Sequence, residues 1–216
     1  IAVFTLISAT VAEFGFNILQ TLLLYSITVI IGLTILTFVE YPLMLKLFTK
    51  MNVVKFFKTQ RQVIAVAFST SSSAATLPVT MDICEKKLGV PNKIASFVLP
   101  LGTTINMDGT ALYQAVAAMF IAQVYGFDLN LTQQLTIVFT AALAAIGTAP
   151  VPGIGLIMLI IVLKSVGVPE EGIALIIGVD RLLDMCRTVP NVIADSLACV
   201  VIASSEGELA PMNLDG

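Results

Sequence analysis

The sequence contains no histidine and no tryptophan, and only 12% of its 216 residues carry a charge. Soluble domains average about 25% charged residues, whereas 57% of this chain is hydrophobic. The three cysteines, Cys84, Cys186 and Cys199, are odd in number, and their spacing matches neither a zinc site nor a disulfide framework. The net charge of −3 comes without a patch of basic and aromatic residues, so nucleic acid is not an expected partner. These deficits favour an integral membrane protein in a lipid bilayer.

Charged residues are absent from one long stretch, the 35 residues 129–163. A membrane-spanning helix needs about 20 apolar residues, so this stretch is too long for one ordinary span. The motif GTAPVPG at 147–153 lies near its centre, and its Gly and Pro residues favour two half-length helices that meet at a tip. The alternative is a plain loop between two full spans.

Basic residues flank a second, shorter apolar segment on both sides. Lys46 and Arg61 precede residues 62–85, and Lys86 follows them. Because positive residues accumulate on the cytoplasmic side, we expect this segment to enter the membrane and return to the same side. The stretch 129–163 has acidic flanks instead, which predicts a second re-entrant hairpin that enters from the outside.

Each predicted hairpin is followed by an interrupted spanning helix, at 94–127 and at 172–204. The order of hairpin and broken helix therefore occurs twice, with opposite topology. Inverted repeats whose discontinuous helices meet near the membrane midplane are the architecture of secondary transporters, and backbone exposed at hairpin tips is tolerated where it lines a cavity. The arrangement predicts an all-α transporter and not an enzyme.

A stripe of polar residues marks the last predicted helix: Asp180, Asp184, Arg187, Asn191 and Asp195. Their spacings of 4, 3, 4 and 4 place them within an arc of about 80° on an α-helix. Ionisable groups at membrane depth are costly and mark a substrate or ion path. The stripe is therefore the candidate functional site.

Within the stripe, Arg187 offers a two-pronged guanidinium for a carboxylate, and Asp184, one turn earlier, offers a partner for an ammonium group. A substrate with both groups is an amino acid, and an arginine directed at its side chain makes it an acidic one. The alternative is an internal ion pair between Asp184 and Arg187 at i, i+3. The residues alone leave both interpretations open, while Asp195 is expected to bind a cation.

Two further motifs carry polar groups into apolar segments. NMDGT at 106–110 contains Asn, Asp and Gly, a composition that unwinds a helix and frees backbone carbonyl groups. Oxygen ligands without His or Cys suit a hard cation such as Na⁺; the alternative is a kink with Asp108 in a structural hydrogen bond. TSSSAATLP at 70–78 supplies N–H groups that could hold a carboxylate, or small residues for close packing alone.

Four motifs together resemble the dicarboxylate/amino acid:cation symporter family, which includes glutamate and aspartate transporters. They are TSSSAATLPVTM at 70–81, LPLGTTINMDGTALYQ at 99–114, QQLTIVFTAALAAIGTAPVPG at 133–153 and LLDMCRTVPNVIAD at 182–195. The motifs stand in the order and spacing of that family, and the similarity covers nearly the whole chain from about residue 20.

The resemblance implies the moving transport domain of a symporter that works by an elevator mechanism. It implies the end of scaffold helix five at 1–17, transmembrane helix six at 18–48, re-entrant hairpin one at 50–88, helix seven at 91–127 with a break at NMDGT, re-entrant hairpin two at 129–166, helix eight at 170–205 and a cytoplasmic tail at 206–216. It also implies a multi-pass protein of the plasma or inner membrane, and a homotrimer formed through scaffold helices that this sequence lacks.

The same resemblance implies an acidic amino acid as substrate, Na⁺ as coupling ion and no organic cofactor. The substrate would be held by Ser72, Ser73, Thr110, Val151, Gly155, Asp184, Arg187, Thr188 and Asn191. One sodium site would use Gly102, Asn106, Asn191 and Asp195, and a second would use Thr104 with Ala145, Ile146 and Thr148. A third would use Asp108 and Asn106 with groups from helix three.

The sequence departs from the family pattern at three places. Pro150 stands at a hairpin tip that is commonly Gly, which should stiffen that tip. A second arginine expected near the substrate is replaced by Ser71 or Met185, the two positions where the family carries it. Pro190 lies inside the last helix, where it removes one hydrogen bond.

Several alternatives share this fold. A proton could replace Na⁺, and the substrate could be a neutral amino acid or a C4-dicarboxylate, although Asp184 argues against the latter because a dicarboxylate has no ammonium group. A passive channel would show current without coupled uptake. An intramembrane aspartic protease with Asp108 and Asp184 as its dyad would carry a GxGD motif, which the sequence lacks.

Overall fold

The computed structural model describes residues 5, 8 and 17–213, so the helix end expected at 1–17 lies almost wholly outside the described residues. Every regular element in the described part is a helix, in agreement with the predicted all-α class. The placement of its hairpins in a membrane stays a prediction.

The first apolar segment forms one rod with a local widening. α2 (Asn17–Ile35) passes into a π-helical turn, η1 (Leu36–Glu40), and then into α3 (Tyr41–Phe48). Pro42 has no N–H to donate to the preceding turn, and the N–H of Tyr41 donates to the Leu36 carbonyl, five residues back. The widened turn therefore accommodates a proline that an unbroken α-helix would not.

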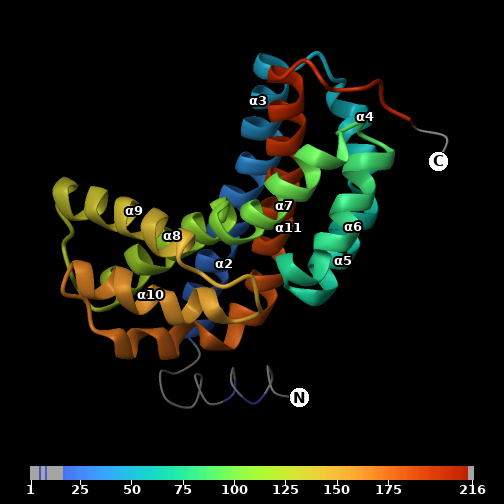
Figure 1. The fold of residues 1–216 in the computed structure, drawn as a ribbon. Helices are drawn as coiled ribbons and strands as arrows, with labels where there is room; N and C mark the ends of the chain where they lie inside the picture. Colours follow the sequence, from blue (N-terminus) through green and yellow to red (C-terminus); the bar gives the residue numbers. More distant parts are fainter. Residues whose placement is uncertain (1–4, 6–7, 9–16, 214–216) are drawn as a thin grey trace.

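The residues predicted as hairpin one form three helices. These are α4 (Val53–Thr59), α5 (Arg61–Thr70) and α6 (Ser73–Lys86). α5 and α6 lie side by side as an antiparallel pair (Figure 1). Ser71, in the left-handed conformation, ends α5, and the Ser72 hydroxyl caps α6 by accepting the Ala75 N–H. Small polar residues at this turn thus end one helix and start the next.

The NMDGT motif separates α7 (Asn92–Ile105) from α8 (Asp108–Val124). Only Asn106 and Met107 are non-helical, so the unwound segment is shorter than the four residues NMDG suggest. Asp108 falls in the first turn of α8, where a carboxylate is favoured by the helix dipole.

The charge-free stretch forms two half-length helices, as its Gly and Pro residues predict. α9 (Leu131–Ile146) begins with a reciprocal cap between Asn130 and Gln133, and residues 147–153 lead into α10 (Ile154–Ser165). A 3-10 turn, η2 (Glu170–Gly172), then precedes α11 (Ile173–Ser205), which continues through Pro190.

Two hydrophobic clusters organise these helices. One includes Val29, Tyr113, Ile137, Leu159 and Leu183, from α2, α8, α9, α10 and the first half of α11. The other contains residues of α3, α4, α5, α6 and α7 together with the second half of α11. In Figure 1 the α8–α9–α10 group and the α5–α6 pair form two arms, with α11 running between them. The polar stripe of α11 therefore lies where the two clusters meet.

Two helical stretches among the described residues are long and apolar enough to cross a membrane, Ile18–Phe48 and Glu170–Ser205. The Ile18–Phe48 stretch has many exposed large hydrophobic residues, including Leu23, Ile31 and Phe38. Contiguous exposed apolar surface of this kind marks contact with lipid or with other helices.

The segment after α11 folds back onto the turn that follows α6. The Ala210 N–H donates to the Gly89 carbonyl at 2.9 Å, and Lys93 forms an ion pair with Glu208 at 2.6 Å. Gly89 has φ +75°, and a Cβ at this position would lie 2.3 Å from the Ala210 carbonyl oxygen. Only glycine permits this close approach.

We predict that Gly89→Ala detaches the C-terminal segment, because the added methyl group overlaps the Ala210 carbonyl. Amide hydrogen exchange at Ala210 should become at least about tenfold faster, as expected when a protecting contact opens more easily. Gly126→Ala is the matched control, since Gly126 has φ +74° but nothing within 4 Å of the added Cβ. Equal effects of the two variants would show that backbone strain, and not the close approach, governs the segment.

Candidate functional site

The tips of the two helix hairpins meet beside α11. The Ser72 hydroxyl donates to the Pro150 carbonyl at 2.8 Å, and the Ala74 N–H lies 3.4 Å from the same oxygen. The Gly153 N–H donates to Asp184 Oδ2 at 2.9 Å. Both tips therefore close over the centre of the polar stripe.

The predicted stripe is buried along its whole length. Asp180, Asp184, Arg187, Asn191 and Asp195 all expose 7% or less of their surface. Burying this many ionisable groups is costly unless each has a partner. Their partners therefore define what the site can bind.

Arg187 forms an ion pair with Asp184, the second of the two interpretations that the sequence left open. Its Nε and Nη2 lie 3.0 and 2.9 Å from Asp184 Oδ1, and its guanidinium carbon lies 4.4 Å from the centre of the Tyr113 ring. Tyr113 in turn donates to Asp180 Oδ1 at 2.6 Å. The arginine is thus held by a carboxylate and an aromatic face.

Gly155 allows the arginine to occupy this position. A Cβ on Gly155 would lie 2.4 Å from Arg187 Nη1, so any other residue would displace the guanidinium. Gln114 Nε2 donates to the Gly155 carbonyl at 3.1 Å and fixes the start of α10 from the other side. Gly155, predicted as a substrate contact, therefore also positions Arg187.

Two buried donors in this centre have no hydrogen-bond partner among the described residues: Arg187 Nη1 and the Ser71 hydroxyl. Both residues line a small cavity of about 20 Å³. The cavity is also lined by Ser73, Met107, Thr110, Thr148, Ala149, Pro150, Val151, Gly155, Asp184, Thr188 and Asn191. Since an unpaired buried donor costs about 1–3 kcal/mol, the two groups suit an anionic or hydrogen-bond-accepting ligand.

The predicted substrate residues gather here. Ser73, Thr110, Val151, Gly155, Asp184, Arg187, Thr188 and Asn191 all line the cavity, and Ser72 binds the opposite tip. The Thr188 hydroxyl donates to the Asp184 carbonyl of its own helix at 2.8 Å. The Thr110 hydroxyl, on α8, accepts a hydrogen bond from Asn191 Nδ2 at 3.0 Å.

The first predicted sodium set is brought together in part. Asn106 Nδ2 donates to Asp195 Oδ1 at 3.0 Å, and a Cβ on Gly102 would lie 2.6 Å from the same oxygen. The Asn191 side chain turns away from Asp195, because its Oδ1 accepts the Gly109 N–H at 2.8 Å. The structure therefore joins Gly102, Asn106 and Asp195, and places Asn191 at the small cavity beside Arg187.

Asp108 lies on the opposite side of the α7–α8 break, next to α3. Tyr41 donates to Asp108 Oδ2 at 3.2 Å and lies 3.3 Å from the Pro190 carbonyl. This carbonyl belongs to α11, which continues through Pro190. Asp108 is half-buried and shares a cavity wall with Asn106.

The second predicted sodium set is not joined by any described side-chain contact. The exposed Thr104 donates to the Leu101 carbonyl at 2.7 Å, and the Thr148 hydroxyl donates to the Ala144 carbonyl at 2.8 Å. Ala145 is buried, whereas Ile146 is exposed on the outer side of α9. The residues lie at the ends of α7 and α9, with their hydroxyls directed to their own helices.

The Asp195 carboxylate and the Asn106 amide suit a small monovalent cation better than a transition metal. Among residues 17–213, no cluster of three or more His, Cys, Asp or Glu side chains is present that could hold a metal ion of that kind. Carboxylate and amide oxygens are hard ligands of the kind that Na⁺ prefers.

Several residues of the site were not among the sequence-based predictions. Tyr113, Gln114 and Tyr41 contact Arg187, Gly155 and Asp108 respectively. Tyr113 and Gln114 belong to the motif LPLGTTINMDGTALYQ and lie one helical turn after NMDGT, so their positions could have indicated a place in the site. No feature of the sequence indicates the contact of Tyr41, because that contact depends on how α3 packs.

An apolar helical chain whose two hairpin tips close over a buried polar cavity is typical of membrane transport proteins. The comparison with known families makes this specific: the chain belongs to the sodium:dicarboxylate symporter family, whose model matches residues 1–205. The resemblance of the four motifs is thereby confirmed.

Similar curated proteins include excitatory amino acid transporters from animals. The chain is 50% identical over 181 residues to excitatory amino acid transporter 1 of Rattus norvegicus, a match that covers 84% of this chain and 33% of the relative. It is 49% identical over 179 residues to excitatory amino acid transporter 4 of Mus musculus (83% and 32% covered). It is 45% identical over 183 residues to an excitatory amino acid transporter of Caenorhabditis elegans (85% and 36% covered). The chain therefore spans about a third of the length of the curated relatives it matches.

We predict that Tyr113→Phe destabilises the protein, because it leaves the buried Asp180 carboxylate without its 2.6 Å donor. The loss of a hydrogen bond to a charged group should cost about 1.5–3 kcal/mol, measured by denaturant unfolding of the full-length protein in mixed micelles. Tyr125→Phe, at an exposed tyrosine, is the control and should change stability by less than about 0.5 kcal/mol. Equal stability of the two variants would contradict the role given to the Asp180 contact.

Proposed function

We propose that the full-length protein is a secondary-active symporter that takes up acidic amino acids, aspartate or glutamate, together with Na⁺. Two kinds of finding support this. The family is that of sodium:dicarboxylate symporters, and the similar proteins are named excitatory amino acid transporters. The described residues supply a buried polar cavity with groups of the required charge.

The observation that carries the cation coupling is a pair of carboxylates without a basic partner, of which Asp195 is buried and Asp108 is half-buried. Asp184 is paired with Arg187, but no salt bridge to Asp195 or Asp108 occurs among residues 17–213. Asp195 exposes 1% of its surface and has one amide donor. An uncompensated buried charge costs several kcal/mol, and a bound cation at each carboxylate removes that cost.

The substrate is held, in this proposal, by the two unpaired donors and by Asp184. The side-chain carboxylate of the amino acid accepts hydrogen bonds from Arg187 Nη1 and the Ser71 hydroxyl, both of which face the same cavity. Its ammonium group binds Asp184, in place of the Gly153 N–H that now donates to Oδ2. Ser71 thus takes over part of the role that a second arginine has elsewhere in the family.

Coupling follows from the contacts of the α9–α10 tip. Gly153 of this tip is hydrogen-bonded to Asp184, and Pro150 is hydrogen-bonded to Ser72. The tip closes the cavity, and its position therefore depends on what Asp184 binds. A ligand shifts a conformational equilibrium only through its different affinity for the two states. Cations that order this tip only with substrate present would make uptake coupled, and the closed domain would then move as one body in an elevator mechanism.

The setting of this cycle belongs to the same proposal. In this proposal the protein is a multi-pass protein of the plasma or inner membrane, and the two helices long and apolar enough to cross a membrane support that setting. The exposed apolar face of α2 and α3 would contact scaffold helices or lipid. A homotrimer assembled through those scaffold helices would hold the scaffold still while this domain moves.

A neutral amino acid is the second candidate substrate, and one observation favours it. The charge of Arg187 is already balanced by Asp184, and Ser71 and Met185 replace the second arginine. A substrate of net charge −1 would therefore meet a cavity of lower positive charge than a second arginine would provide.

We predict that Arg187→Cys weakens L-aspartate binding by about 100-fold, because truncating one member of a buried charge pair costs about 2–5 kcal/mol. Binding of alanine or serine should improve. The matched control is Arg181→Cys, on the same helix but 48% exposed and 3.9 Å from Asp184, and it should stay within about threefold of the parent. Titration of the full-length protein with both ligands measures this, and unchanged aspartate affinity in Arg187→Cys would refute the assignment.

We predict that Asp195→Asn lowers by about one the slope of log affinity for aspartate against log Na⁺ concentration, as expected when one coupled cation site is lost. Asp128→Asn, at an exposed carboxylate in the loop before α9, should leave the slope unchanged. The measurement is aspartate binding across a range of Na⁺ concentrations at constant ionic strength. An unaltered slope in Asp195→Asn would remove Asp195 from the cation sites.

A further inference from the structure

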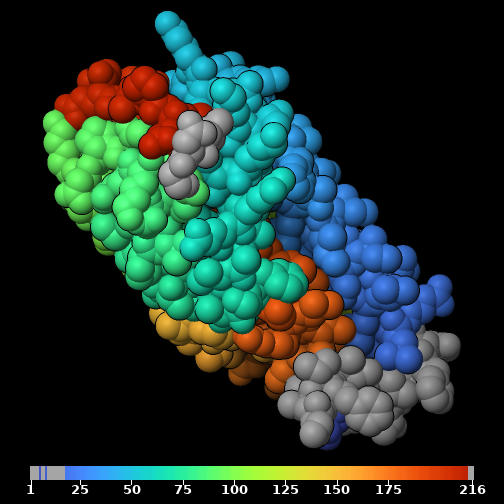
Figure 2. Space-filling model, turned by 90° about the vertical axis from the view of Figure 1, so that its right-hand side faces the viewer, coloured from blue at the N-terminus to red at the C-terminus, as the bar shows by residue number. Residues whose placement is uncertain are grey.

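A large groove lies at the end of the molecule away from the hairpin tips. It has a volume of about 790 Å³ and runs between the connection of α3 to α4 and the C-terminal segment, residues 206–213. Figure 2 shows this segment (red) lying across the end of the molecule beside the α3–α4 region (cyan). The volume is in the range of cavities that hold small ligands.

The groove is positively charged throughout. Lys46, Lys50 and Lys55 line it, and none of the Asp and Glu side chains among residues 17–213 does. These three lysines form no salt bridge among residues 17–213, whereas Lys86, Lys93 and Lys164 are each paired with a carboxylate. A chain with a net charge of −3 therefore keeps three uncompensated cations together in one groove.

The two acidic residues in the described part of the C-terminal segment face the other side. Glu206 and Glu208 line a neighbouring cavity together with Lys93, and Glu208 is bound to that lysine. Gly207 and Leu209, which alternate with them, line the groove. The docked segment therefore closes one wall of the groove without neutralising it.

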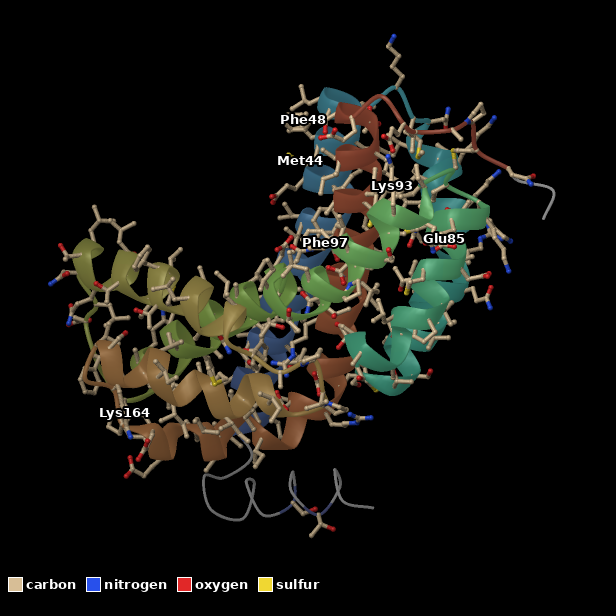
Figure 3. All side chains as sticks on the ribbon, viewed as in Figure 1. Met44, Phe48, Glu85, Lys93, Phe97 and Lys164 are labelled. Carbon is tan, nitrogen blue, oxygen red and sulfur yellow. The ribbon has the colours of Figure 1, made fainter. Side chains whose placement is uncertain are left out.

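The groove adjoins the end of an apolar membrane span. The stretch Ile18–Phe48 ends inside it, and Leu47, Phe48 and Val54 expose 66%, 55% and 64% of their surface beside the lysines. Phe48 and Lys93 lie near one end of the molecule, and Lys164 lies near the other (Figure 3). Eight of the 11 basic residues fall between positions 46 and 93, which makes this end the cytoplasmic one under the positive-inside rule.

We propose that this groove is a binding site for an anionic phospholipid of the cytoplasmic leaflet. The three lysines bind the phosphate of the headgroup, and Leu47, Phe48 and Val54 contact the first carbons of the acyl chains. Free lysines next to exposed apolar side chains at the end of a span suit the level of the headgroups. A soluble phosphate compound would use the lysines but not the apolar rim, so the rim favours the lipid.

The test is titration of the full-length protein, in a neutral detergent, with dioctanoyl phosphatidylglycerol, followed by microscale thermophoresis. Dioctanoyl phosphatidylcholine and glycerol 1-phosphate are the comparison ligands. Phosphatidylglycerol should bind at least about tenfold more tightly than either. Equal binding of phosphatidylcholine would overturn the role of the lysines, and equal binding of glycerol 1-phosphate would overturn the lipid in favour of a soluble phosphate compound.

Two variants of equal charge locate the site. Lys46→Gln with Lys50→Gln and Lys55→Gln should lower the phosphatidylglycerol affinity about 100-fold, since each lysine contributes about fivefold. Lys58→Gln with Arg61→Gln and Lys86→Gln removes the same charge at residues that do not line the groove and should have little effect. Replacing the three groove lysines by arginine should preserve binding, which separates loss of charge from misfolding. Equal losses in the two glutamine triples would contradict a defined site.

Discussion

The ion pair between Arg187 and Asp184 is the contact on which the rest of the site depends. It fixes a buried guanidinium against the Tyr113 ring, and it leaves one guanidinium nitrogen directed into the cavity. The second oxygen of Asp184 holds the α9–α10 tip through Gly153. Because one carboxylate serves both the arginine and the tip, whatever binds Asp184 also changes the closure of the cavity.

Asp195 and Asp108 pose the opposite problem, because the buried carboxylate of Asp195 and the half-buried carboxylate of Asp108 have no basic partner among the described residues. Amide and phenol donors from Asn106 and Tyr41 satisfy part of their hydrogen-bonding capacity but none of their charge. The helix break at Asn106 and Met107 lies between them. A single unwound segment therefore connects the two places at which a cation would lower the energy of the folded protein, next to the Arg187 cavity.

Much of this arrangement could be predicted from the order and spacing of residues. The stripe from Asp180 to Asp195 follows from helical periodicity, and the break at 106–107 and the tip at 147–153 follow from Asn, Gly and Pro. The partners could not be predicted, because they depend on rotamers and packing between distant helices. Asn191 binds the Gly109 N–H and not Asp195. Tyr41 contacts Asp108 from α3, and no sequence motif predicts the π-helical turn that precedes this helix. The free hydroxyl of Ser71 likewise depends on its left-handed backbone at the end of α5.

In the mechanism we propose, Na⁺ compensates the carboxylates of Asp195 and Asp108 and drives uptake of an acidic amino acid. This coupling is tested by uptake of labelled L-aspartate by the full-length protein in liposomes, with an inward Na⁺ gradient compared with an inward proton gradient. We expect uptake with the Na⁺ gradient and none with protons alone. Uptake driven by protons without Na⁺ would rule out the proposed coupling, because the carboxylates would then be neutralised by protonation.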